Sequence, residues 1–271
     1  MSSKRTMTNE EQIELWNHCL EIVSAERLDE LEETAVKRAK EIATKVGVIG
    51  YGYSGGKDSL VLANIMKVAG LESLPHFCSL YAFEYPVMDN WLLKNAPAGT
   101  DFVKSELYGV DFLNKNPRYL FPDLTDTKVR YEYTRSWRPQ EVQWVRKNKI
   151  TNMFYGRRID DGNYCGKKED GIYVNRNLGV PLTSWHIIAD WKLPEVMAYM
   201  KSRELELPPI YDFPKGWRYG THAWTERNLV DGSVNRTFED VYAIDKEAVI
   251  NAAKDGLIAA QDFLKLKGVA Y

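Results

Sequence analysis

The spacing of apolar and polar positions predicts helices at the start of the chain and a buried strand after them. Residues 8–24 and 28–44 place apolar side chains three or four positions apart, which is the spacing of an amphipathic helix. An apolar run beginning at Val46 is typical of a buried strand, and it breaks into a turn rich in glycine and serine. Residues 60–69 then have the composition of a helix.

Strands and helices continue to alternate over the rest of the chain. Further strands are predicted at residues 74–83, 101–107, 151–155 and 181–185. Further helices are predicted before residue 95 and at residues 138–149, 193–201 and 243–266, the last as one long closing helix. Irregular structure is predicted for two stretches rich in Gly, Pro, Asn or Asp, at residues 114–127 and 160–180.

This alternation predicts an α/β fold with three layers, in which a doubly wound and mostly parallel sheet carries helices on both faces. We expect three parts along the chain: an N-terminal helical extension at residues 1–45, a central domain at residues 46–230 and a C-terminal helical segment at residues 231–271. The two N-terminal helices are expected to pack on the sheet.

The turn after the first strand has the features of an anion-binding site. It contains the sequence SGGKDS, from Ser54 to Ser59, between the predicted strand and the next predicted helix. Backbone N–H groups and the positive end of a helix dipole converge at such a turn. Lys57 adds a cation, and the two serines add hydroxyl donors. The sequence therefore predicts that a phosphorylated ligand binds here.

Two common phosphate-binding patterns do not describe this turn. The Walker A pattern fails because Lys57 is followed by Asp58 and because position 51 is not a glycine. The dinucleotide pattern is formally met by Gly50, Gly52 and Gly55. Two of these glycines lie late in the apparent strand, and the acidic residue expected about 20 positions further on would be Glu72, which lies in a turn. We therefore reject both patterns.

The SGGKDS sequence instead resembles the PP-loop of the ATP pyrophosphatases, the adenine nucleotide alpha-hydrolase-like superfamily. The resemblance implies that ATP is bound and cleaved at its α-phosphate, which gives AMP or an adenylate and pyrophosphate. It further implies that Lys57 and Asp58 are catalytic and that Asp58 lies near a Mg²⁺ ion. The nucleotide-binding residues that it implies in the loop are Ser54, Gly55, Gly56, Lys57, Asp58 and Ser59.

Four later segments resemble the phosphoadenosine-phosphosulfate (PAPS) reductase branch of this superfamily. They are FEYPVMDNW from Phe83, FYGRRIDD from Phe154, IIADWKLPEVMAYM from Ile187 and LPPIYDF from Leu207. They follow the loop in the order that the family has. The resemblance implies that adenine lies beside the end of the second strand, where Tyr81 and Phe83 are candidate binding residues, and that Gly156 contacts the nucleotide.

Arg157 and Arg158 follow the predicted strand at residues 151–155. Ligands of open α/β sheets bind at the carboxyl ends of strands, and paired guanidinium N–H groups suit phosphate or sulfate. Both arginines are therefore candidate catalytic residues. The alternative for each is a surface salt bridge to Asp160 or Asp161.

Charge is nearly balanced over the whole chain but not within one region. A net charge of −2 gives no general case for binding nucleic acid or a membrane. From Lys128 to Lys168, however, eleven basic residues stand against four acidic ones. Such a run is usually a solvated face. Beside a phosphate loop it also suits an anionic second substrate or a nucleic acid.

Composition indicates a soluble protein from a reducing compartment. No apolar run approaches the roughly 20 residues that span a bilayer, and the polar start of the chain is not a signal peptide. The three cysteines, Cys19, Cys78 and Cys165, are far apart, which argues against a disulfide framework. We expect a cytoplasmic protein with no membrane partner, and we leave open a homodimer.

The chain departs from the PAPS reductases in one respect, because those enzymes use a cysteine near the C-terminus and none follows Cys165 here. The leading hypothesis is therefore an ATP pyrophosphatase that uses ATP and Mg²⁺. One alternative is a reductase or sulfotransferase acting on PAPS or adenylyl sulfate through Cys165. Another is a non-catalytic nucleotide sensor or a subunit of a nucleic-acid-modifying complex.

Three polar side chains of the second half have both a structural and a functional interpretation. Asp190 is either a helix N-cap or a functional residue. His186 and His222 are candidate proton-transfer groups because imidazole titrates near neutral pH. A structural, hydrogen-bonded role is favoured for both histidines.

Overall fold

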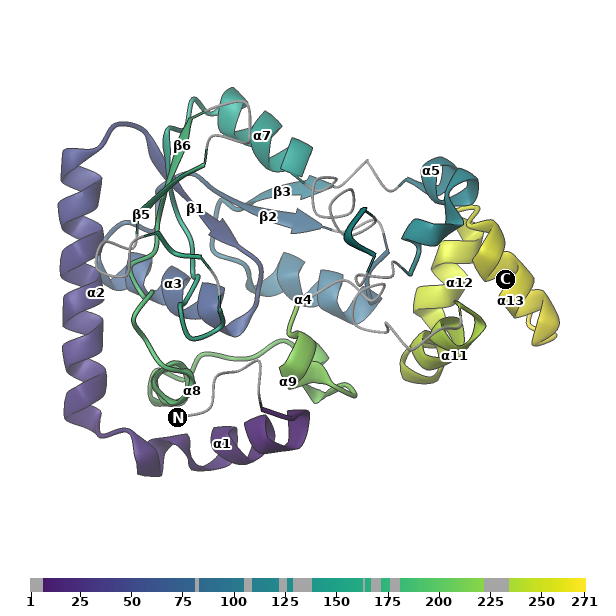
Figure 1. The fold of residues 1–271 in the computed structure, drawn as a ribbon, viewed down its shortest axis with the longest axis horizontal. Helices are drawn as coiled ribbons and strands as arrows, with labels where there is room; N and C mark the ends of the chain where they lie inside the picture. The colour runs from purple at the N-terminus through teal and green to yellow at the C-terminus, as the bar shows by residue number, and fades with distance from the viewer. Residues whose placement is uncertain are drawn as a thin grey trace.

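The computed structural model describes residues 7–80, 83–104, 109–121, 126–128, 138–162, 164–166, 172–175, 181–221 and 234–271. Within these ranges helices and strands alternate, and the strands form one sheet with helices on both faces (Figure 1). No helix of the described ranges is long and apolar enough to cross a bilayer. His222 lies outside these ranges.

Six strands form the sheet at the centre of the fold. They are β1 (Ile49–Tyr53), β2 (His76–Leu80), β3 (Asp101–Lys104), β4 (Asn152–Phe154), β5 (Ile172–Asn175) and β6 (Leu182–Trp185). Their order in the sheet is β3-β2-β1-β4-β6-β5. Neighbours are parallel from β3 to β6, and β5 joins the edge in the antiparallel direction. The doubly wound, mostly parallel sheet predicted from the sequence is therefore confirmed.

The chain passes from β1 to β2 and β3 on one side and then returns to β4 on the other side of β1. The connections after β1 and β4 therefore leave the sheet in opposite directions. A crevice opens at such a switch point, outside the carboxyl ends of the strands, and it is where ligands of open α/β sheets bind. The loop with the SGGKDS sequence lies at this point.

One face of the sheet is covered by α7 (Arg138–Lys147), which lies apart from α3 and α4 in Figure 1. This face has a small core of its own, formed by Phe77, Trp144, Val145, Ile150, Met153 and Leu182. The opposite face packs into the larger core with α3 (Lys57–Val68), α4 (Pro86–Asn95) and α8 (Leu193–Ser202). Side chains of β1 that face this larger core are those of Ile49, Tyr51 and Tyr53.

The N-terminal helices form a further layer. Helix α1 (Asn9–Ile22) packs against α8 and α9 (Gly216–Tyr219), and α2 (Ala25–Lys45) packs against α3 and α8. We expected both on the sheet itself, whereas their main contacts are with helices. Thr8 and Ser24 N-cap the two helices, because each hydroxyl accepts a backbone N–H of the first turn.

The sequence predicts one long helix at residues 243–266, but the structure has the end of one helix and two further helices there. They are α11 (Val234–Ile244), α12 (Lys246–Lys254) and α13 (Ile258–Leu266). Asp245 N-caps α12 by accepting the N–H of Glu247 at 2.9 Å, and Gly256 has a φ of 95° between α12 and α13. The long helix was therefore a wrong prediction, because these two residues stop helix propagation.

A short helix and a 3-10 turn join the C-terminal helices to the rest of the fold. They are α5 (Val110–Lys115) and η1 (Pro117–Tyr119), and the first of them lies beside α12 and α13 in Figure 1. The Asn114 side chain donates to the Gly256 carbonyl at 3.0 Å and accepts the N–H of Ile258 at 2.9 Å. One amide side chain thus satisfies backbone groups on both sides of the break before α13.

Two further sequence predictions need correction. Strand β5 lies within residues 160–180, which we predicted to be irregular, because a four-residue edge strand is too short to give a clear alternation. Asp190 is not a helix N-cap. Its carboxylate accepts two bonds from Arg38, at 3.0 and 3.1 Å, while Asp160 accepts the N–H of Leu193 in the first turn of α8. Trp191 is a core residue.

Candidate functional site

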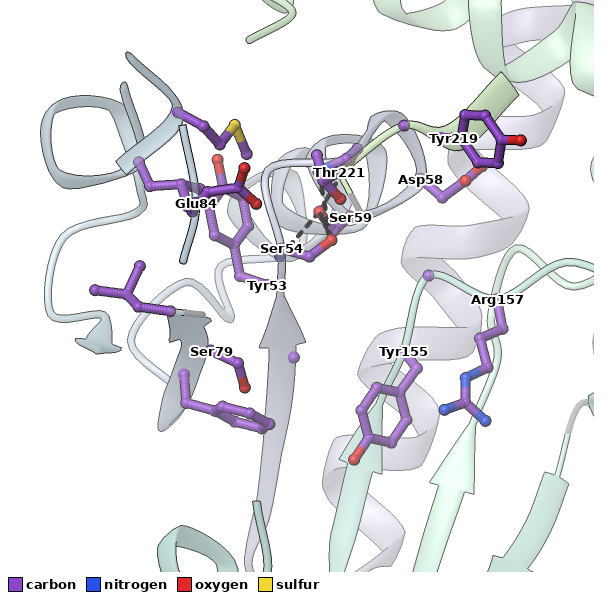
Figure 2. A pocket seen from close by; sticks show the side chains of 18 of the residues that line it. Tyr53, Ser54, Asp58, Ser59, Ser79, Glu84, Tyr155, Arg157, Tyr219 and Thr221 are labelled. Atoms are coloured by element: carbon purple, nitrogen blue, oxygen red, sulfur yellow. Dashed lines mark hydrogen bonds between the residues drawn. The ribbon is translucent and has the colours of Figure 1, made fainter. Parts of the chain in front are cut away.

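A pocket of about 330 Å³ opens at the carboxyl ends of β1, β2 and β4, where the strand order reverses (Figure 2). The phosphate-loop candidate, residues 54–59, forms one wall. Helix α4 and the chain after β4 form others. The lining residues are Gly52, Tyr53, Ser54, Gly56, Asp58, Ser59, Phe77, Ser79, Leu80, Glu84, Met88, Asp89, Leu92, Glu141, Tyr155, Gly156, Arg157, Tyr211, Tyr219, Gly220 and Thr221.

Hydroxyl groups accept the backbone N–H groups of the loop. The Ser54 N–H donates to the Ser59 hydroxyl at 3.2 Å, and the Gly56 N–H donates to the Ser54 hydroxyl at 3.4 Å (Figure 2). The N–H of Lys57 donates to the phenol oxygen of Tyr211 at 3.0 Å. The loop therefore directs at least three amide donors at oxygen atoms, which is the arrangement that binds an anion at a helix N-terminus.

Glycine is required at two positions around this loop. Gly55 has a φ of 68°, and a Cβ there would lie 2.7 Å from the Leu92 side chain of α4. A Cβ on Gly156 would lie 2.5 Å from the carbonyl oxygen of Asp58. The chain after β4 thus touches the first turn of α3, which brings Arg157 and Arg158 next to the loop.

Lys57, Asp58, Arg158 and Asp161 form a buried cluster of charges behind the loop. The Lys57 ammonium lies 2.5 Å from one carboxylate oxygen of Asp58, and Arg158 Nε lies 2.7 Å from the other. Arg158 also donates to Asp161 at 2.8 Å and to the Trp191 carbonyl at 3.2 Å. The side chains of Lys57 and Arg158 are 1% and 0% exposed.

The charges of this cluster compensate one another. Burial lowers the pKa of Arg158, but the carboxylates of Asp58, Asp161 and Asp160 outweigh burial and raise it. The carboxylates therefore hold Arg158 as a cation, and neither Arg158 nor Lys57 lines the pocket. From the sequence, the alternative for Arg158 was a surface salt bridge. In the structure the Arg158 side chain is buried where it pairs with Asp58 and Asp161.

Arg157 lies at the pocket, unlike its neighbour. It lines the cavity, its side chain is exposed, and its guanidinium lies 5.2 Å from the ring centre of Tyr155 (Figure 2). The hydroxyl of Tyr155 makes a short hydrogen bond to Glu141 of α7. This hydrogen bond holds the Tyr155 ring in place, and the guanidinium of Arg157 lies against that ring at one side of the pocket.

His186 follows β6 beneath this side of the pocket. It is buried, and its Nδ1 lies 3.4 Å from the Tyr155 carbonyl oxygen. Burial, helped by the charge of Arg157, lowers the pKa of His186 to about 4. The imidazole is therefore neutral near pH 7 and does not line the pocket.

The surroundings of Asp58 do not fit a Mg²⁺ ligand. Both of its carboxylate oxygens are engaged, one by Lys57 and one by Arg158. Among the described residues there is no group of three or more His, Cys, Asp or Glu side chains that could hold a metal ion. The assignment of Asp58 as a metal ligand stays a prediction, and we derive no step through Mg²⁺.

Most of the predicted loop residues line the pocket, and the predicted adenine contacts are less well placed. Ser54, Gly56, Asp58 and Ser59 line it directly, as does Gly156. Phe83 is buried and does not line it, whereas the side chain of Leu80 at the end of β2 does. Tyr81 lies outside the described residues.

Several pocket residues escaped sequence reasoning. Tyr211 belongs to the segment LPPIYDF, which was noted only for its resemblance to a family segment, yet its phenol oxygen accepts the N–H of Lys57 in the loop. Tyr53 and Tyr155 each stand at the end of a strand, directly before a polar turn, and that position was a usable signal. Asp89 lies on α4 within the segment FEYPVMDNW, but nothing singled it out there, and Glu141 of α7 carried no signal of its own.

All three cysteines are buried. Burial raises the pKa of the Cys165 thiol to about 11, against the opposing effect of Arg157. It raises the pKa of Cys78 to about 12. Thiolate chemistry at neutral pH is therefore disfavoured at both positions.

The basic region from Lys128 to Lys168 lies only partly within the described residues. Its described part includes α7, which covers one face of the sheet, and the chain with Arg157 and Arg158. Arg157 is the basic side chain of this part that lines the pocket. Binding of a nucleic acid or of an anionic second substrate stays a prediction.

Comparison with known proteins gives likenesses of structure. No family model matches the sequence, and no curated protein sequence matches it either. Among solved structures, the phosphoadenylyl-sulfate (PAPS) reductase of Candida auris is 15% identical with a TM-score of 0.48, over 70% of this chain and 92% of that one.

Two other similar structures are enzymes of different kinds. The Candida glabrata FMN adenylyltransferase, in complex with FAD and inorganic pyrophosphate, is 13% identical with a TM-score of 0.49, over 76% of this chain and 68% of that one. The U34-tRNA thiolase NcsA of Methanococcus maripaludis is 13% identical with a TM-score of 0.43, over 91% and 82%. The likeness to each of these three proteins is one of overall structure alone.

Proposed function

We propose that the protein binds ATP at the loop of residues 54–59 and cleaves it between the α- and β-phosphates. The observation that carries this proposal is the loop itself. It joins a parallel central strand to a helix, it directs three backbone N–H groups at hydroxyl oxygens, and it opens into a pocket at the switch point of the sheet.

The β- and γ-phosphates would take the place of the hydroxyl oxygens as partners of the loop. A phosphate oxygen carries a negative charge, and charge-assisted hydrogen bonds are roughly twice as strong as neutral ones. The N-terminus of α3 adds the positive end of its dipole. Ser54 and Ser59 remain beside the phosphates and can donate their O–H groups to them.

The cations around the pocket have different roles in this proposal. Arg157 is exposed in the pocket and can bind a phosphate without breaking a buried ion pair. Lys57 does not line the pocket, and its ammonium lies 2.5 Å from a carboxylate oxygen of Asp58, so its side chain must move to reach a phosphate. Arg158 stays in the buried cluster, where it holds Asp58 and Asp161 and so positions the first turn of α3.

In the reaction, an oxygen of the second substrate attacks the α-phosphorus. A bond forms between that oxygen and phosphorus, and the bond from phosphorus to the bridging oxygen of the β-phosphate breaks. Pyrophosphate leaves with the electron pair, and the substrate becomes an adenylate, or AMP forms if the attacking oxygen belongs to water. The protein contributes position and charge compensation to this step.

We do not propose reduction of a sulfonucleotide. That reaction needs a reactive thiol, and burial raises the pKa of Cys165 to about 11. Nucleotide binding without turnover, as in a sensor or a subunit of a nucleic-acid-modifying complex, is one outcome of the following experiment.

The test uses ATP labelled at the α-phosphate, incubated with Mg²⁺ and the protein, with and without a cell extract that supplies the second substrate. We expect label in AMP or an adenylate together with pyrophosphate. Label in ADP contradicts the proposal. Tight binding of ATP with no product in either incubation supports the sensor instead.

A matched pair of variants connects the products to the loop. Gly55→Ala and Gly70→Ala both place a Cβ where φ is positive, at 68° and 70°, but only the first Cβ would meet neighbouring atoms. We expect Gly55→Ala to lower the rate at least about tenfold through displaced amide donors, and Gly70→Ala to leave it unchanged. Equal rates for both variants, with folding checked by thermal unfolding, contradict the assignment of the loop.

A further inference from the structure

Two polar side-chain atoms at the pocket are buried without a hydrogen-bond partner among the residues that the structure describes. They are the Oδ1 atom of Asp89 and the hydroxyl of Tyr53, and both residues line the cavity. Tyr53 is only 4% exposed. A buried polar atom left unpaired costs about 1–3 kcal/mol, so such atoms are rare and call for an explanation.

Both groups lie close to the phosphate loop. Tyr53 is the last residue of β1 and directly precedes Ser54. Asp89 belongs to α4, whose residues Met88 and Leu92 line the pocket and approach Gly55. If the phosphates of a nucleotide occupy the loop, its base can therefore lie against the wall of the pocket that Tyr53 and Asp89 form.

The charged and titratable groups around Asp89 leave it a carboxylate near neutral pH. Burial raises its pKa to about 6, and the charge of Lys104 at the end of β3 opposes that rise. Asp89 in turn raises the pKa of Cys78 of β2, after burial, which keeps that thiol protonated. At pH 7.5 Asp89 therefore acts mainly as a hydrogen-bond acceptor, whereas the phenol of Tyr53 can donate.

Asp89 and Tyr53 thus offer an acceptor and a donor at the same pocket, and this pair suits one edge of a purine base. Adenine presents the N6 amino donor next to the N7 acceptor, whereas a 6-oxopurine presents two acceptors, O6 and N7. The amino group can donate to Asp89 while N7 accepts from Tyr53. A 6-oxo group would instead bring its oxygen against the carboxylate. Leu80, Met88 and Leu92 supply apolar surface for the faces of the ring.

We propose that Asp89 and Tyr53 are the specificity-determining residues that recognise the amino-bearing edge of adenine, so that the pocket selects ATP over 6-oxopurine nucleotides. This assignment rests on the proposed function, because it requires the phosphates to occupy the loop. It assigns a role to two side chains, from β1 and α4, that the sequence analysis did not single out.

The test measures dissociation constants by titration calorimetry at pH 7.5 for ATP, inosine triphosphate and inorganic tripolyphosphate. Inosine triphosphate carries a 6-oxo group in place of the amino group, and tripolyphosphate reports the loop alone. The wild type is expected to bind ATP at least about tenfold more tightly than inosine triphosphate, since a site built for a donor rejects an analogue without it. In Asp89→Asn this ratio should fall to about twofold or less, because an amide can either accept or donate.

Two controls separate base recognition from a general defect. Tripolyphosphate should bind Asp89→Asn and the wild type equally well. Asp111→Asn, at an exposed position on α5, should leave all three dissociation constants unchanged.

The contact with Tyr53 has a test of its own. Tyr53→Phe should weaken the binding of ATP severalfold. It should leave the affinity for 7-deaza-ATP, which lacks N7, unchanged.

The wild type alone also tests the proposal if a variant does not fold, since inosine triphosphate and 7-deaza-ATP each remove one contact from the ligand. Equal affinities of the wild type for ATP and both analogues would overturn the assignment of Asp89 and Tyr53. So would an unchanged ratio of ATP to inosine triphosphate in a folded Asp89→Asn variant. If neither ATP nor tripolyphosphate binds the wild type, the proposed function itself fails, and the recognition of adenine fails with it.

Discussion

The guanidinium of Arg158 and the ammonium of Lys57, both buried, share the carboxylates of Asp58 and Asp161. Such a cluster is only weak evidence for stability as a whole, because desolvation of the charges offsets their attraction. Removing a single member is different, since it leaves a buried charge without its partner. The neighbouring Arg157 makes no comparable buried pair within the described residues.

The two adjacent arginines should therefore respond differently to the same substitution. We expect Arg158→Met to lower the free energy of unfolding by about 3 kcal/mol, because Asp58 and Asp161 lose their shared cation. Arg157→Met should change that free energy by less than about 0.5 kcal/mol and should weaken ATP binding, because its side chain faces the pocket. Urea unfolding and an ATP titration of both variants provide the two measurements.

The opposite pattern would contradict these roles, namely a stable Arg158→Met that fails to bind ATP and an Arg157→Met that binds normally. The sequence could predict that two arginines follow β4 beside the loop, but not which of them would be buried. That depends on Gly156, which brings the chain to within contact of Asp58, and on acidic partners that two different segments contribute.

Elements with a clear amphipathic pattern were predictable, and short or interrupted ones were not. Helix α2 buries one stripe of regularly spaced side chains, whereas α8 is buried on most of its surface, and the sequence located both. Strand β5 has four residues at a sheet edge, and no alternation identifies it. The break before α12 had a signal in Asp245, whose side chain caps that helix, but apolar residues on both sides of it continue a helical spacing.

A short 3-10 element, η2 (Pro209–Asp212), acts on the loop from a distance of more than 150 residues along the chain. Its Tyr211 accepts the Lys57 N–H at 3.0 Å, so this phenol occupies a position that a phosphate oxygen would take. Tyr211 also packs edge-on against Trp217 of α9, which fixes the ring. We infer that η2 holds the empty loop open in its binding conformation.

Tyr211→Phe should therefore destabilise the free protein and favour the bound one. We expect the free energy of unfolding to fall by about 1 kcal/mol, the usual value of one hydrogen bond. Pyrophosphate should bind severalfold more tightly, because no hydroxyl competes for the Lys57 N–H. Thermal unfolding with and without pyrophosphate measures both effects. Tyr219→Phe, in the same pocket, is the matched control, and weaker pyrophosphate binding in Tyr211→Phe alone would show that the phenol assists the ligand instead.

At the scale of the whole molecule, the site results from the order of the strands. The order β3-β2-β1-β4-β6-β5 places the loop after β1 next to the chain after β4 and lets α4 close one side. The alternation of helices and strands predicts a parallel sheet, but many strand orders satisfy it. Asp89, Tyr155 and Tyr211 were for this reason not predictable as neighbours, although the loop and the arginines were.

The central claim is that residues 54–59 bind the pyrophosphate end of ATP. Amide chemical shifts of isotope-labelled protein, followed while inorganic pyrophosphate is added, test it most directly. The account predicts that the largest shifts occur at Ser54, Gly56 and Lys57, whose N–H groups exchange hydroxyl partners for phosphate oxygens. The amide of Gly70, at the far end of α3, should not move. Saturable binding that leaves the three loop amides unshifted would contradict the account.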